Sequence, residues 1–260
     1  MTVRLQEFIH KYEEGPGYRY LTYVLGLFAM IMIAAGYNLM SYRNLTTREG
    51  MDAAQLARNL AEGRGYTTEF IRPLSIHLLK KSQLARERRA LPEAARLTNV
   101  SVWPQAKDWA RLQAGHPDLA NPPLYPLLLA GALKAMPFEY PELRAGDPFR
   151  VYAPDQWIAG FNQALLLAAA AGVFFLARRL FEEAVAWVAT GVMLGAELLW
   201  QFTLSGYSTM LAMVIFVGLA GVLAKLDAAA REGKSPARLL LLGGLGGVLT
   251  GLGGLTWYSV

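Results

Sequence analysis

The chain has 260 residues, of which 54% are hydrophobic, a formal net charge of +5 and no cysteine. The lack of cysteine excludes a disulfide framework and a thiolate metal site. Long uncharged runs alternate with strongly charged segments, a composition typical of a membrane protein, and no nucleic-acid partner is expected.

Five segments are predicted to cross a membrane as α-helices. A hydrocarbon core of about 30 Å requires about 20 apolar residues per helix. Four runs of that length carry no charge, and a fifth carries one, Glu197. We therefore expect an all-α polytopic membrane protein with spans at residues 20–42, 156–177, 184–203, 207–224 and 239–258.

The basic residues of the short connections predict the orientation. Cytoplasmic connections carry an excess of lysine and arginine, and long loops contribute little to this signal. The connection "TLSGYS" has no base, whereas the other short connections and the 1–19 segment are basic: Arg4, Lys11, Arg19, Arg178, Arg179, Lys225, Arg231, Lys234 and Arg238. We expect the inner (plasma) membrane, a cytoplasmic 1–19 segment and an outward 43–155 loop.

The outward loop opens with a predicted helix at about 50–62, within the stretch "REGMDAAQLARNLAEGRGYTT" at 48–68. At 100° per residue its polar side chains fall within an arc of about 140°. These are Glu49, Asp52, Gln55, Asn59 and Glu62. Small apolar residues occupy the opposite side, so the helix is expected to lie on the membrane or on other helices, with its acids facing either water or a site.

A second juxtamembrane helix is predicted at about 123–136. Prolines at 122, 123 and 126 begin it, and the apolar run that follows is too short to span a bilayer. His116 and Asn121 are expected near the head-group layer. The basic stretch 77–97 between the two helices is either a solvated surface or attracts anionic lipid head groups.

The fifth span is rich in glycine, at positions 243, 247 and 251 among others. Glycine at this spacing permits close packing of helices in a membrane, but it disfavours an isolated helix. We therefore expect a neighbour on this span, either a partner subunit or a C-terminal half of a longer, truncated chain.

Several of these segments together resemble a known family. "LARNLAEGRGYTT" follows the first span and an acidic residue, "IRP" and "NPPLYPLLLAGALKA" come later, and "LSGYSTML" opens a span before "VLTGLGGLT". Their order and spacing resemble the N-terminal half of GT-C superfamily membrane glycosyltransferases, of the protein mannosyltransferase and aminoarabinose transferase kind. The resemblance covers residues 18–136 and, more loosely, 185–260.

The resemblance implies transfer of a sugar from a polyprenyl-phosphate donor to a lipid, glycan or protein acceptor at the outer membrane face. It places the acid that deprotonates the acceptor at Glu49. Many members have two adjacent acids, whereas Gly50 follows here and Asp52 lies one turn later. Tyr125 falls in the second juxtamembrane helix, which is mainly scaffold in the family.

Chemistry at such a site also needs positive charge near the leaving phosphate. Arg48, Arg58 and Arg72 are the nearby candidates for binding a phosphate or lipid head group, and Arg72 alternatively fixes the loop. Glu197 either borders the same cavity or reaches the membrane surface. Glu49 and Asp52 could hold a divalent metal, but alone they make an incomplete site, so no metal site is predicted. The cofactor is unknown, and a divalent metal is one candidate.

Two other functions fit the same sequence features. The first is a non-catalytic scaffold or lipid-binding subunit with GT-C-like architecture, which the glycine at position 50 favours. The second is a small transporter, which is disfavoured because paired charges deep in several spans and an inverted repeat are missing.

Overall fold

The computed structural model describes residues 16–73, 76–77, 81, 85, 115–118, 120–136 and 152–257. The regular secondary structure of this part of the chain is helical apart from one short antiparallel pair, β1 (Thr67–Thr68) with β2 (His116–Pro117). The helices are α2 (Pro16–Ser41), α3 (Arg48–Ala61), α6 (Leu124–Lys134), α7 (Ala153–Leu180), α8 (Glu183–Gly195), α9 (Glu197–Ser205), α10 (Thr209–Arg231) and α11 (Pro236–Thr256). The expected all-α fold is confirmed. Most of the 77–97 stretch lies outside the described residues.

The expected number of membrane-spanning helices is also confirmed. Four helices are long and apolar enough to cross a bilayer, namely α2, α7, α10 and α11, and α8 with α9 forms a fifth if the pair is one span. The fourth span is longer than predicted, because the helix continues to Arg231 rather than ending at 224. The chain is therefore a polytopic membrane protein.

The third span differs from the sequence prediction, because it is not one straight helix. α8 ends at Gly195, Ala196 adopts an extended conformation (φ −77°, ψ 101°), and α9 begins at Glu197 after a bend of 55°. The indole Nε1 of Trp200 donates a hydrogen bond of 2.7 Å to the carbonyl of Leu194, which satisfies one group freed by the break. The break places Glu197 in the first turn of a helix, where the helix dipole favours a carboxylate.

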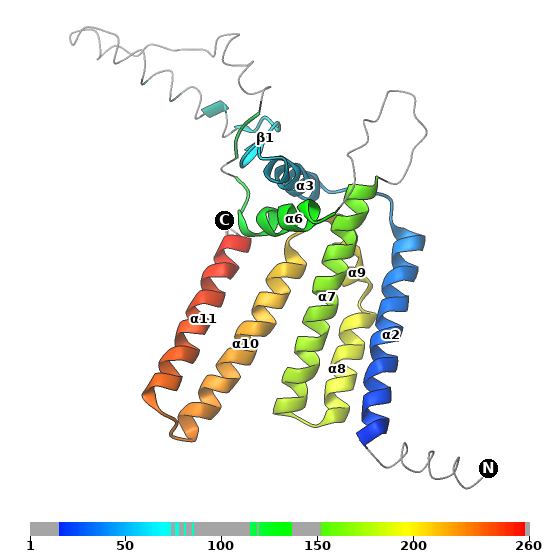
Figure 1. Ribbon diagram of the computed structural model, residues 1–260, viewed down its shortest axis with the longest axis vertical. Helices are drawn as coiled ribbons and strands as arrows, with labels where there is room; N and C mark the ends of the chain where they lie inside the picture. The colour runs from blue at the N-terminus through cyan, green and yellow to red at the C-terminus, as the bar shows by residue number, and fades with distance from the viewer. Residues whose placement is uncertain are drawn as a thin grey trace.

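The long helices lie side by side, and the two short helices α3 and α6 lie across one end of them (Figure 1). The connection between α7 and α8 and the connection between α10 and α11 lie at the opposite end. The two predicted juxtamembrane helices thus correspond to α3 and α6, and they belong to the same end of the bundle.

Small side chains allow α3 to dock closely on α6. Ala53, Ala54 and Ala57 of α3 are buried against Tyr125 and Leu129 of α6. The same cluster reaches down to the long helices through Ile158, Leu211 and Ile215. The apolar side of α3 therefore faces protein, as its sequence pattern indicated, and this packing fixes α3 over the end of the bundle.

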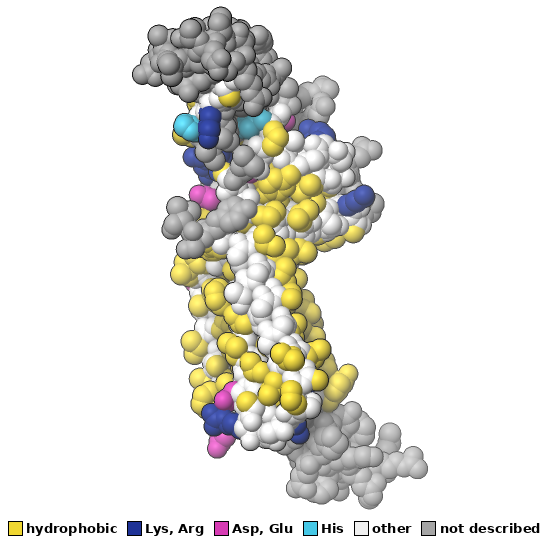
Figure 2. All heavy atoms as spheres, turned by 90° about the vertical axis from the view of Figure 1, so that its left-hand side faces the viewer, with side chains coloured by type: hydrophobic (Ala, Val, Ile, Leu, Met, Phe, Trp, Pro, Cys, Tyr) yellow, Lys and Arg dark blue, Asp and Glu magenta, His cyan; other side chains and the backbone are white. Residues whose placement is uncertain are grey.

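The sides of the bundle expose large hydrophobic side chains that water would not favour. Four examples are Phe28, Val188, Phe216 and Leu241, whose side chains are 60%, 66%, 69% and 71% exposed. Figure 2 shows hydrophobic side chains along the body of the molecule and the lysines and arginines gathered toward its two ends. Such a surface is expected of a protein surrounded by lipid.

Candidate functional site

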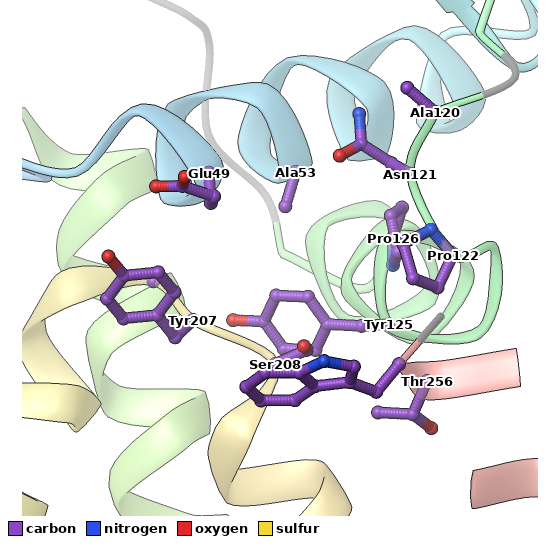
Figure 3. Close-up of a pocket in the computed structure, with 12 residues that line it drawn as sticks. Glu49, Ala53, Ala120, Asn121, Pro122, Tyr125, Pro126, Tyr207, Ser208 and Thr256 are labelled. Atoms are coloured by element: carbon purple, nitrogen blue, oxygen red, sulfur yellow. The ribbon is translucent and has the colours of Figure 1, made fainter. Parts of the chain in front are cut away.

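A cavity of about 430 Å³ opens where α3 and α6 meet the ends of the long helices (Figure 3). Five segments contribute to its wall: the first turn of α3, the loop before α6, the first turn of α6, the start of α10 and the end of α11. Its lining is mostly apolar, and Glu49 is the one charged residue among the described residues that line it. The lining residues are Glu49, Ala53, Ala120, Asn121, Pro122, Tyr125, Pro126, Gly206, Tyr207, Ser208, Thr256 and Trp257.

The start of α3 positions Glu49 through its N-cap, Thr47. The Thr47 hydroxyl accepts a hydrogen bond from the Gly50 amide (3.2 Å) and donates one to the Ser205 carbonyl (2.6 Å). The first bond caps α3, and the second ties it to the end of α9. Glu49 therefore lies in the first turn of a helix whose position is fixed, and its carboxylate faces the same space as Tyr207 (Figure 3).

Two glycines make this junction between α3 and α9 possible. A Cβ atom at position 50 would overlap the Ser205 carbonyl oxygen. Gly206 ends α9 in the left-handed conformation (φ 78°), and a Cβ there would lie 3.0 Å from the Gly50 Cα. Position 50, directly after Glu49, therefore has no room for a side chain, acidic or otherwise.

The wall formed by α6 is held by a buried polar chain. The Tyr125 hydroxyl donates a hydrogen bond of 3.0 Å to Asn162 Oδ1 on α7, and Asn162 Nδ2 donates one of 3.4 Å to the Thr203 carbonyl on α9. Burial raises the pKa of Tyr125 well above its ordinary value, although the hydrogen bond to Asn162 lowers it in part. Tyr125 therefore stays neutral and fixes the floor of the cavity.

The loop before α6 is also fixed by hydrogen bonds. The buried carboxylate of Asp118 accepts from the Ala120 amide (3.0 Å) and from the Asn121 side chain. The Tyr66 hydroxyl donates to the Asn121 carbonyl (2.9 Å). These bonds hold Asn121 at the cavity wall, opposite the first turn of α3 (Figure 3).

Asp52, the second candidate acid, does not line the cavity. Its side chain is 2% exposed and forms an ion pair with Arg72. This pair attaches the chain that follows β1 to α3, so the geometry favours the loop-fixing role of Arg72. A role of either residue toward a substrate stays a prediction.

The remaining candidates lie apart from this cavity. Arg58 donates a hydrogen bond of 3.3 Å to the Tyr152 hydroxyl and lies over its ring, and Arg48 is exposed at the start of α3. His116 pairs with Thr68 in the short sheet. Glu197 lines a second cavity, which shares Tyr207 with the first.

Among the lining residues that were not assigned from the sequence, four have polar or aromatic side chains, namely Tyr207, Ser208, Thr256 and Trp257. They lie at the ends of two spans, and only the fold brings those ends under α3. Asn162, which holds Tyr125, carried a usable signal, because a buried amide in a membrane-spanning helix requires partners.

The described residues contain no group of three or more histidine, cysteine, aspartate or glutamate side chains that could hold a metal ion. The chemistry available at the cavity is that of one carboxylate, two hydroxyl side chains of the α9–α10 connection and an amide, in a mostly apolar space. Comparison of the chain with protein-family models, with curated proteins and with solved structures found no match.

Proposed function

We propose that the chain acts as a membrane glycosyltransferase of the GT-C kind, which moves a sugar from a polyprenyl-phosphate donor to a hydroxyl of a lipid, glycan or protein acceptor. The observation that carries the proposal is the position of Glu49. It is the one charged residue among the described residues that line a cavity at the end of a membrane helix bundle, where a lipid-borne substrate and a polar acceptor can meet.

In the proposed reaction the Glu49 carboxylate accepts the proton of the acceptor hydroxyl. The acceptor oxygen forms a bond to the anomeric carbon, the bond between that carbon and the phosphate oxygen breaks, and polyprenyl phosphate leaves with the electron pair. A positioned base of this kind contributes about 10²–10⁴-fold to rate.

The leaving phosphate needs compensation of its charge, and no arginine or lysine is among the described lining residues. The first turn of α10 begins at this cavity with Ser208 as its N-cap, and the Ser208 side chain makes no capping hydrogen bond. Free backbone amides at a helix start favour an anion. The start of α10 and the side chains of Arg48, Arg58 and Arg72 are the candidates for binding this phosphate.

For orientation, we propose that the α3 and α6 end faces outward from the inner (plasma) membrane. Arg178 and Arg179 end α7, and Arg231, Lys234 and Arg238 lie at or beside the α10–α11 connection, and both groups lie at the end opposite α3 and α6. The positive-inside rule places those bases in the cytoplasm.

A transfer assay on the chain in lipid nanodiscs, with a polyprenyl-phosphate sugar as donor, tests the proposal. Glu49→Gln should lower the rate by about 10²-fold or more. The matched control is Glu62→Gln at the other end of α3, where the carboxylate is exposed and pairs only with Arg64. Equal rates for wild type and Glu49→Gln would remove Glu49 as the base.

The second candidate is a non-catalytic scaffold or lipid-binding subunit. The absence of a cation among the described lining residues and the space-limited Gly50 favour it. Lack of transfer by wild type and by both variants, with the protein folded, would support this function over catalysis.

A further inference from the structure

Two further cavities lie one after the other along the seam between α2 and the α8–α9 pair. The lower one is an apolar cavity of about 520 Å³, lined by residues that include Gly26, Met30 and Ile33 of α2 and Trp187 and Gly191 of α8. We call this part the lower groove. It lies within the membrane-spanning portion of these helices.

The upper part is a polar cavity, also of about 520 Å³, which we call the upper pocket. Its lining includes Tyr37 and Ser41 of α2, Arg43 of the following loop, and Glu197 and Gln201 of α9. Each volume falls in the range of about 300–1,000 Å³ that small-molecule sites occupy.

The two cavities follow the same faces of the same helices. On α2 the lining residues recur every three or four positions, at Tyr23, Gly26, Met30, Ile33, Tyr37 and Ser41. Residues at this spacing share one side of a helix. Ile33, at the top of the lower groove, is one turn from Tyr37 in the upper pocket, and Gly195 is two residues from Glu197. The seam thus changes from apolar to polar toward the α3 end.

α2 touches the rest of the bundle at two levels along this seam. Near its start Tyr23 stacks on Trp187, and near its end Tyr37 contacts Trp200. Only 6% of its most apolar 18-residue window is buried. The space between these two contacts is lined mostly by apolar side chains, which favour contact with lipid acyl chains.

The upper pocket contains a positive and a negative side chain, Arg43 and Glu197, and both are exposed. Neither forms an ion pair within the part of the chain that the structure describes. The Glu197 carboxylate accepts a hydrogen bond of 3.2 Å from Gln201 Nε2. An ionised group at the edge of a membrane span is expected to face a partner or a ligand.

We propose that this seam binds a phospholipid whose head group carries a phosphate and a primary amine, such as phosphatidylethanolamine. The acyl chains occupy the lower groove, Arg43 pairs with the phosphodiester, and Glu197 accepts hydrogen bonds from the ammonium group. A zwitterionic head group satisfies both unpaired charges at once, whereas an anionic lipid satisfies Arg43 alone. This site adjoins the cavity of Glu49, with which it shares Tyr207, but it does not depend on the proposed transfer reaction.

Native mass spectrometry of the purified full chain tests the proposal, after incubation with micelles that contain equal amounts of phosphatidylethanolamine and phosphatidylglycerol. Wild type should retain phosphatidylethanolamine in preference. Glu197→Gln should lower its retention about tenfold and leave phosphatidylglycerol unchanged, because a charge-assisted hydrogen bond is lost. Arg43→Gln should lower the retention of both lipids.

Filling the lower groove gives an independent test. A Cβ at Gly191 meets no atom within 4 Å, so Gly191→Leu places a side chain in the groove without a backbone clash and should lower retention of both lipids. Gly243→Leu on the outer side of α11 adds the same side chain to open space and should change nothing, and Arg238→Gln is the matched charge control. Monodisperse elution and an unchanged melting temperature confirm that each variant is folded.

Three results would overturn the proposal. Equal retention of the two lipids by wild type would remove the amine from the recognition. If Gly243→Leu lowered lipid retention as much as Gly191→Leu does, the retained lipid would be lipid that surrounds the protein rather than lipid bound in the groove. Displacement of phosphatidylethanolamine by a polyprenyl-phosphate sugar, with the same dependence on Arg43 and Glu197, would assign the seam to that lipid instead.

Discussion

Replacement of Gly50 by alanine adds one methyl group where α3 meets α9. At an unhindered helical position this change stabilises a protein by about 0.5–1 kcal/mol. At position 50 the new Cβ would overlap the Ser205 carbonyl oxygen and lie 2.8 Å from Thr47 Oγ1. Because the obstacle is backbone rather than a flexible side chain, α3 must move away from α9.

The cost can be estimated from the groups involved. Overpacking costs about 1–3 kcal/mol, and loss of the Thr47–Ser205 hydrogen bond costs about 1 kcal/mol more. After subtraction of the gain in helix propensity, Gly50→Ala should lower the free energy of unfolding by roughly 1–3 kcal/mol. For a chain of this size that corresponds to a fall in melting temperature of about 2–12 °C.

Thermal unfolding in nanodiscs, followed by intrinsic fluorescence, measures the effect. The matched control is Gly131→Ala on α6, because a Cβ there meets nothing within 4 Å and the residue is exposed. The control should raise the melting temperature slightly, so one substitution should act with opposite signs at two helical glycines. A Gly50→Ala protein as stable as Gly131→Ala would refute the close approach of α3 to α9.

Two further predictions concern buried polar groups. Asp52→Asn should lower the free energy of unfolding by about 3–5 kcal/mol, because it leaves the Arg72 charge buried without its partner. The double variant Asp52→Leu with Arg72→Met should recover most of the loss. Thermal melts of wild type and the two variants check this, and equal losses in the single and double variants would contradict it. Burial raises the folded-state pKa of Tyr125, so its contribution is complete below the unfolded pKa of about 10 and falls as pH rises above it. The difference in melting temperature between wild type and Tyr125→Phe should therefore shrink from pH 9 to pH 11, and a constant difference would show that Tyr125 does not titrate differently in the fold.

The spans could be predicted because their signal is the length of an uncharged run, and neighbouring helices do not alter it. The break in the third span could not be predicted, because residues 184–203 contain one charge and no proline. The bend is stabilised by a hydrogen bond from Trp200 to Leu194, which only the folded chain makes. Helix existence follows from composition, whereas a break inside a helix depends on where its freed backbone groups find partners.

Part of the candidate site, namely the helix that carries Glu49, was predictable in a similar way. Periodicity predicted α3 and its polar side, but Asp52 and Glu49 are only three residues apart and meet different surroundings. What covers each side chain depends on the segment around Arg72 and on the ends of α10 and α11, all distant in sequence. The position of a side chain around the helix axis follows from the local sequence, whereas its burial depends on distant segments.

The contact between α3 and α9 at Gly50 and Gly206 also determines the depth of Glu49 relative to the bilayer. At this junction the Gly50 and Gly206 backbones are in contact and the Thr47 hydroxyl bonds to the Ser205 carbonyl, and α9 is separated from α8 by the bend at Ala196. A change in the tilt of α9, such as a thinner or thicker bilayer imposes on a membrane helix, would therefore carry the carboxylate with it. The depth of the acid is governed by a membrane helix rather than by the surface loop that contains it.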